Sequence, residues 1–182
     1  MSPSAEFAVA FDVATLPEAL ALDDALGEGP EFAKLGLELF AAEGPAVVRG
    51  FKARGRRVFL DLKLHDIPNT VKGAAASAAR LGADLLTVHA TGGPEMIAAA
   101  VQGIREAGGT TRVVAVTILT SHDPAHMPPG FAQPFDLDRT VIALTRMSLE
   151  AGAAGIVCAA PDLRRCARHW ARRSTRSRPA SA

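Results

Sequence analysis

The sequence lacks the features that would place it in a membrane, a secretory route or a metal-binding class. No apolar run reaches about 18 residues, so no transmembrane helix is predicted. The start MSPSAEFAVAFD has no basic region before its acidic Glu6, so no secretory signal is expected and the default location is the cytoplasm. The two cysteines, Cys158 and Cys166, match no metal-finger spacing and are expected to be buried or free thiols.

Neither sign of charge is in excess over the whole chain. The 182 residues carry a net charge of +1, which argues against a dedicated nucleic-acid binder. A hydrophobic content of 48% is typical of one soluble globular domain with a core. The exception is the segment 163–182, which has no acidic residue but holds seven of the sixteen arginines and the only tryptophan.

Short apolar segments alternate with helix-like segments along the chain. This alternation predicts βαβ units and a parallel sheet, hence an α/β fold. The unit length favours a (β/α)₈ TIM barrel of which about six of eight units are present, with an open flavodoxin-like sheet as the alternative. Glycines 82, 108 and 152 are expected to follow helix ends. The predicted strands are 7–13, 31–37, 56–64, 83–90, 112–119 and 153–160, and the predicted helices are 16–26, 41–54, 70–82, 94–108 and 136–152.

The stretch FLDLKLHDIPNT (59–70) carries an unusual set of charges for a core strand. Alternate residues of a strand share a face, so Asp61, Lys63 and His65 are expected to point one way and the intervening leucines the other. In a barrel the leucines would meet the outer helices and the charged set would enter the mouth. Thr70 is the predicted N-cap of the following helix.

A lysine held between carboxylates stays an ammonium, because the opposite charges offset the effect of a partly dry site. Such a group can stabilise a developing carbanion and then protonate it. On spacing alone, a structural ion pair at one end of the barrel is an equally good interpretation of Asp61 and Lys63.

Five segments together resemble the orotidine 5′-phosphate decarboxylase family. DLKLHDIPNT is similar to its central motif, while FAVAFDV and FAKLGLELF resemble its first two strands, and TVHATGG and VTILTS resemble later strand ends. The resemblance covers roughly residues 6 to 160. It implies a TIM barrel that converts orotidine 5′-phosphate to UMP in de novo pyrimidine biosynthesis, with no metal and no organic cofactor.

The resemblance also implies roles for individual residues. Asp12 and Lys34 would hold ribose hydroxyls and help to order the charged network. Asp61 and Lys63 would form its catalytic centre, with Lys63 donating a proton to C6 of the pyrimidine.

The resemblance also implies substrate-binding residues outside this catalytic centre. Asp66, with Ile67 and Thr70, would reach into the active site of a partner subunit, which implies a homodimer with shared sites. Thr120 would lie beside the pyrimidine ring.

Two other interpretations concern metals. Mg²⁺-dependent sugar-phosphate decarboxylases of the same superfamily share the DxKxxD core, but Lys34 and the continuation HDIPNT favour the nucleotide enzyme. His122 and His126 are interpreted as loop histidines, because Pro124 between them spoils a helical display of two ligands.

The resemblance implies two further strand–helix units with phosphate-binding arginine motifs, and the sequence shows neither. We therefore expect a partial barrel over 1–162 and an aberrant basic tail over 163–182, disordered or read in a shifted frame. A catalytically dead fragment of the enzyme is the resulting alternative, since an unclosed barrel leaves open edges and lacks a remote substrate contact.

Overall fold

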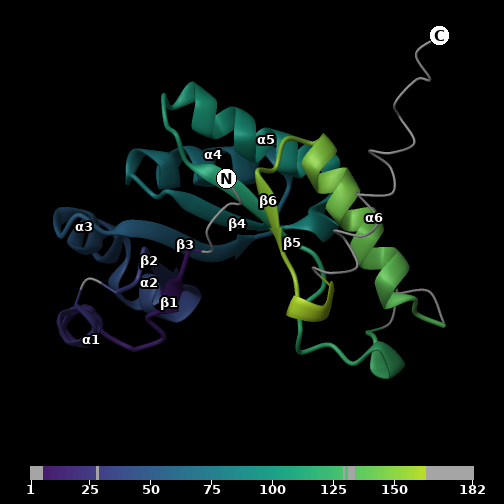
Figure 1. Cartoon of the computed structure of the whole chain (residues 1–182). Helices are drawn as coiled ribbons and strands as arrows, with labels where there is room; N and C mark the ends of the chain where they lie inside the picture. Colours follow the sequence, from purple (N-terminus) through teal and green to yellow (C-terminus); the bar gives the residue numbers. More distant parts are fainter. Residues whose placement is uncertain (1–5, 28, 129, 131–133, 163–182) are drawn as a thin grey trace, which may run out of the picture.

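The computed structural model describes residues 6–27, 29–128, 130 and 134–162 (Figure 1). The strands form one parallel sheet in which each strand pairs with the next in the chain. This sequential order confirms the predicted barrel-type topology. It excludes the flavodoxin-like order, in which the first strand lies between the second and the third. The predicted tail over 163–182 lies outside the described residues. The strands are β1 (Ala8–Ala10), β2 (Phe32–Gly36), β3 (Arg57–Leu64), β4 (Leu85–His89), β5 (Arg112–Val116) and β6 (Gly155–Val157).

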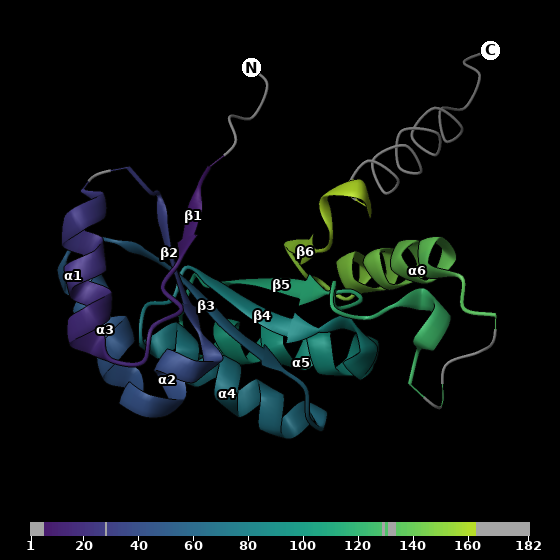
Figure 2. The same ribbon diagram turned by 90° about the horizontal axis from the view of Figure 1, so that it is seen from below.

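The helices lie along the outer side of the curved sheet, and β1 and β6 form its two edges (Figure 2). Register places one buried apolar residue of each central strand in a row beneath these helices. That row consists of Leu35, Leu60, Leu86 and Val113. Among the residues described, no helix is both long and apolar enough to cross a membrane. The helices are α1 (Leu16–Leu26), α2 (Leu37–Glu43), α3 (Pro45–Ala53), α4 (Pro68–Arg80), α5 (Gly93–Glu106) and α6 (Leu137–Glu150), with short 3₁₀ turns η1 (Ala90–Gly92) and η2 (Pro124–His126).

The single helix predicted over 41–54 is wrong, because the chain forms two helices there. Gly44 separates α2 from α3 with a φ of 62° that glycine adopts without steric cost. Pro45 follows, which has no N–H to continue α2 but fits the first position of α3. The predicted glycines after helix ends are confirmed, with positive φ values of 82°, 69° and 98° at Gly82, Gly108 and Gly152.

The predicted N-cap at Thr70 is also wrong. Helix α4 begins at Pro68, its N-cap is Ile67, and Thr70 lies inside the first turn. The reason is again proline, whose fixed φ and missing N–H suit the first helical position. The earlier start matters for the site, because it brings α4 to within two residues of Asp66.

Helices α4 and α5 pack closely at Gly103. A Cβ at this position would collide with the carbonyl oxygen of Lys72 in α4, so a side chain there forces the helices apart. Gly73, on the exposed side of α4, has nothing within 4 Å of such a Cβ.

We expect Gly103→Ala to lower the free energy of unfolding by about 1–3 kcal/mol, because overpacking a helix contact displaces backbone. The matched variant Gly73→Ala should be neutral or stabilising by up to about 1 kcal/mol, since alanine has the higher helix propensity. Urea unfolding followed by circular dichroism measures both. Equal effects of the two substitutions would contradict the close packing.

Candidate functional site

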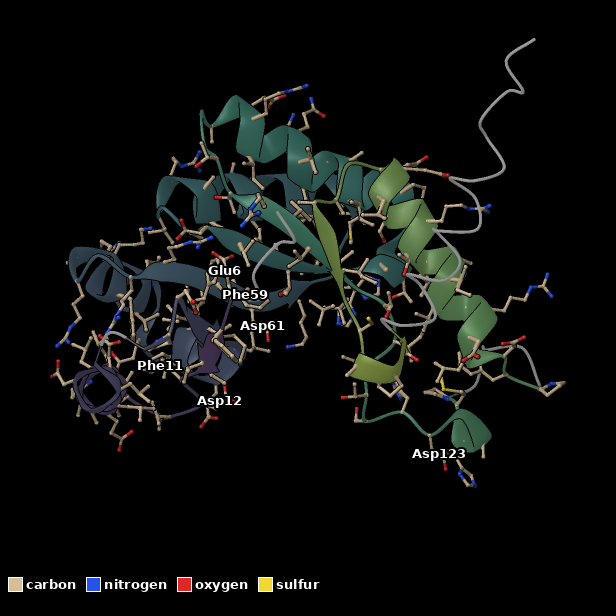
Figure 3. The ribbon with its side chains drawn as sticks, in the orientation of Figure 1. Glu6, Phe11, Asp12, Phe59, Asp61 and Asp123 are labelled. Atoms are coloured by element: carbon tan, nitrogen blue, oxygen red, sulfur yellow. The ribbon has the colours of Figure 1, made fainter. Side chains whose placement is uncertain are left out.

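Four charged side chains form an alternating chain across the first three strands. Lys34 Nζ lies 3.0 Å from Asp12 Oδ1 and 3.8 Å from Asp61 Oδ2. Lys63 Nζ lies 2.7 Å from the same Asp61 oxygen. Figure 3 labels Asp12, which follows β1, and Asp61, which lies in β3; β2, which carries Lys34, lies between these two strands. The structure therefore brings together four of the residues singled out from the sequence, and we call them the charged network.

Parallel pairing explains why these residues meet. The register pairs Ala10 of β1 with Lys34 of β2, and Gly36 at the end of β2 with Asp61 of β3. Gly36 also leaves space for the network, because a Cβ there would lie 3.1 Å from Asp12 Oδ1 and 3.7 Å from Lys34 Nζ. Gly36 was not predicted from the sequence as a site residue, since its role depends on a neighbouring segment.

Exposure decreases towards the middle of the network. The side chain of Asp12 is 65% exposed, that of Lys63 38%, that of Lys34 22% and that of Asp61 only 12%. Two ammonium groups thus flank the most buried carboxylate. Their charges offset the cost of removing Asp61 from water, and the four groups together carry no net charge.

Lys63 has an unusual backbone conformation. Its φ of 49° makes it the one non-glycine residue with positive φ in the described part of the chain. The pairing of β3 with β4 shifts at this point, because a step of four residues from Leu60 to Leu64 lies opposite a step of only two from Leu86 to Val88. The predicted strict alternation of faces therefore fails after Asp61, yet the bulge still directs the Lys63 ammonium to the Asp61 carboxylate. Strained backbone of this kind is often found at functional sites.

Thr87, in the middle of β4, forms hydrogen bonds with two residues of the charged network. Its hydroxyl donates to Asp61 Oδ1 at 2.9 Å and accepts the backbone N–H of Lys63 at 2.7 Å. Thr87 was not predicted from the sequence as a site residue, because threonine is common in strands. The available signal was a single hydroxyl within the apolar run LLTVH.

The other residues singled out from the sequence lie outside the charged network. Asp66 is exposed, and its Oδ1 accepts the N–H of Ile67 at 2.6 Å. Ile67 is 67% exposed, and Thr70 is exposed in the first turn of α4. Thr120 is exposed in the loop that follows β5.

Two histidines lie at the same end of the sheet, where β3 and β4 finish. The rings of His65 and His89 are 5.3 Å apart. Burial, followed by the nearby His65 and Lys63, lowers the pKa of His89 below its ordinary value of 6.5. His89 is therefore neutral at pH 7 and adds no positive charge to the network.

Metal ligands do not gather in the described residues, where no group of three or more His, Cys, Asp or Glu side chains could hold an ion. His126 Nδ1 lies 2.7 Å from Asp123 Oδ2 within the loop after β5. Figure 3 shows Asp123 well apart from Asp12 and Asp61. A hollow of about 480 Å³ lined by Arg105 and Arg112 includes no member of the charged network.

Comparison with known proteins places this geometry in a family. The model of the orotidine 5′-phosphate decarboxylase / HUMPS family matches residues 5–175. The orotidine 5′-phosphate decarboxylase of Anaeromyxobacter dehalogenans is 54% identical over 159 residues, which are 87% of this chain and 68% of that protein. The enzyme of the same name from Cutibacterium acnes is 50% identical over 150 residues, covering 81% of this chain and 64% of that protein.

Two solved structures have a similar fold. The crystal structure of orotidine 5′-phosphate decarboxylase from Lactobacillus acidophilus has a TM-score of 0.82 at 32% identity, over 90% of this chain and 75% of that one. An uncharacterized conserved protein from Geobacillus kaustophilus has a TM-score of 0.78 at 42% identity, over 88% of this chain and 78% of that one. The chain therefore belongs to the orotidine 5′-phosphate decarboxylase / HUMPS family.

Proposed function

We propose that the chain decarboxylates orotidine 5′-phosphate to UMP in de novo pyrimidine biosynthesis, in the cytoplasm. The observation that carries this proposal is the Lys63 ammonium, fixed 2.7 Å from a carboxylate in a strained bulge of β3. The names of the relatives, which are 54% and 50% identical, support the same activity.

The proposed reaction needs a positively charged group beside C6 of the pyrimidine. The bond between C6 and the carboxyl carbon breaks, CO₂ leaves, and the electron pair remains on C6. The Lys63 ammonium stabilises that pair and then donates a proton to C6, which gives UMP and a neutral amine that water reprotonates. Because the ammonium supplies both the positive charge and the proton, the step requires no cofactor.

The rest of the network orients the substrate and the catalytic lysine. Asp61 holds the Lys63 ammonium and adds negative charge near the leaving carboxylate, which favours its departure. Asp12 and Lys34 bind ribose hydroxyls, for which the 65% exposed Asp12 side chain is accessible. Thr120, exposed after β5, contacts the pyrimidine ring.

A second subunit completes the proposed site. Asp66, Ile67 and Thr70 are exposed at the start of α4 and lie outside the charged network of their own chain. Their placement suits residues that reach into the site of a partner, and an isoleucine 67% exposed is suited to an interface. We therefore propose a homodimer with shared active sites.

A specific observation favours a second candidate, a chain of this family without turnover. The chain spans 68% and 64% of the two relatives, so about a third of each has no counterpart here. Contacts to the phosphate that help to drive the chemical step need not all lie in this chain. The Mg²⁺-dependent sugar-phosphate reaction is less well supported, because the Lys34 ammonium already lies 3.8 Å from Asp61 where a cation would otherwise sit.

We expect Lys63→Ala to lower the kcat of UMP formation by about 10² to 10⁴-fold, because it removes the proton donor. Lys52→Ala is the matched control, since Lys52 Nζ lies 2.9 Å from Asp84 Oδ2 in another lysine–aspartate pair outside the network. It should retain kcat. The measurement is UMP formation from orotidine 5′-phosphate by purified protein.

The outcomes separate the two candidates. Turnover by the wild type that is lost only in Lys63→Ala supports the decarboxylase. No turnover in folded wild type, with UMP still bound, supports the candidate without activity. Turnover unchanged by Lys63→Ala would refute the proposed mechanism.

His89 yields a prediction about pH. Its pKa is lowered in the folded protein, so between that lowered value and 6.5 the unfolded chain binds more protons. The free energy of unfolding should therefore fall as the pH drops through this window, and the effect should level off below it. Denaturant unfolding of wild type and His89→Gln at several pH values measures this contribution. An equal pH dependence in both proteins would contradict a lowered pKa.

A further inference from the structure

The hydroxyl of Thr87 contacts two residues of β3 at once, the Asp61 carboxylate and the backbone N–H of Lys63. Thr87 is fully buried in β4, and its neighbours in the strand are apolar. Its one proton goes to Asp61 Oδ1 at 2.9 Å, and its oxygen accepts the Lys63 backbone N–H at 2.7 Å. Because an ionised carboxylate only accepts and an amide only donates, both contacts fix the hydroxyl in a single orientation.

The two hydrogen bonds of Thr87 have different structural effects. The shift in register between β3 and β4 interrupts the ladder at Lys63, and the Thr87 oxygen takes the place of a backbone acceptor. Asp61 has its two oxygens held from different sides, Oδ2 by the Lys63 ammonium at 2.7 Å and Oδ1 by Thr87. The carboxylate is then unable to rotate away from the ammonium.

We infer that Thr87 is a positioning residue that acts through Asp61 and Lys63, setting the carboxylate and the lysine backbone for proton transfer. This inference rests on the proposed decarboxylation. A valine has nearly the same shape but neither donates nor accepts. It would free Asp61 Oδ1, leave the Lys63 N–H without its acceptor, and let the ammonium drift from its place.

The test compares Thr87→Val with Thr87→Ser, which keeps the hydroxyl, and with Thr111→Val as the control for a buried threonine. Thr111 donates to the Ala83 carbonyl oxygen at 2.6 Å, just before β5 begins and outside the network. We expect Thr87→Val to lower kcat by roughly tenfold to 100-fold with little change in KM, because a small misplacement of reacting groups is costly. Thr87→Ser and Thr111→Val should keep kcat.

A structural role alone predicts a different result. In that case Thr87→Val and Thr111→Val would both lower the unfolding midpoint and leave kcat unchanged in the folded fraction. That outcome, or a kcat for Thr87→Ser as low as that of Thr87→Val, would overturn the inference.

A second measurement keeps the inference testable if the wild type shows no turnover, in which case the proposed activity fails by itself. The hydrogen-exchange rate of the Lys63 ammonium, followed by NMR, reports how firmly Asp61 holds it. Faster exchange in Thr87→Val than in wild type and Thr87→Ser supports the positioning role. Equal rates in the three proteins would overturn it.

Discussion

The Asp61 carboxylate is the group on which the rest of the site depends. It is nearly buried, and it contacts the Lys63 ammonium, the Thr87 hydroxyl and, at 3.8 Å, the Lys34 ammonium. Burying a carboxylate without such partners would be costly. The two lysines therefore offset the cost of burying Asp61, and Asp61 in turn fixes where their positive charges lie.

The fold supplies this arrangement through parallel pairing. Strands β1 to β3 follow one another in the sheet, so the residues near their carboxyl ends meet at the same edge. The outward faces of β2 and β3 carry Leu35 and Leu60, which belong to the buried apolar row that packs under the helices. One strand such as β3 thus contributes Leu60 to the core and Asp61 to the site, and the stable packing of the first holds the second in place.

Much of this was predictable from residue patterns, and two of the exceptions have a common cause. Alternation along β3 correctly separated Leu60 from Asp61, and the order of segments predicted a sequential parallel sheet. The bulge at Lys63 and the role of Thr87 were not predicted, because both depend on how β3 pairs with β4. The break between α2 and α3 was also missed, although Gly44 and Pro45 mark it in the sequence.

The bulge shows how the site holds an unfavourable conformation. A non-glycine residue in the left-handed region costs about 1–3 kcal/mol. At Lys63 the cost is offset locally, since hydrogen bonds that involve a charged group contribute about 1.5–3 kcal/mol each and the ammonium makes one to Asp61. The Thr87 hydroxyl adds two hydrogen bonds in the same part of β3, one with the Lys63 N–H and one with the Asp61 carboxylate. The strained lysine and the buried carboxylate therefore stabilise one another, and neither geometry is expected to persist without the other.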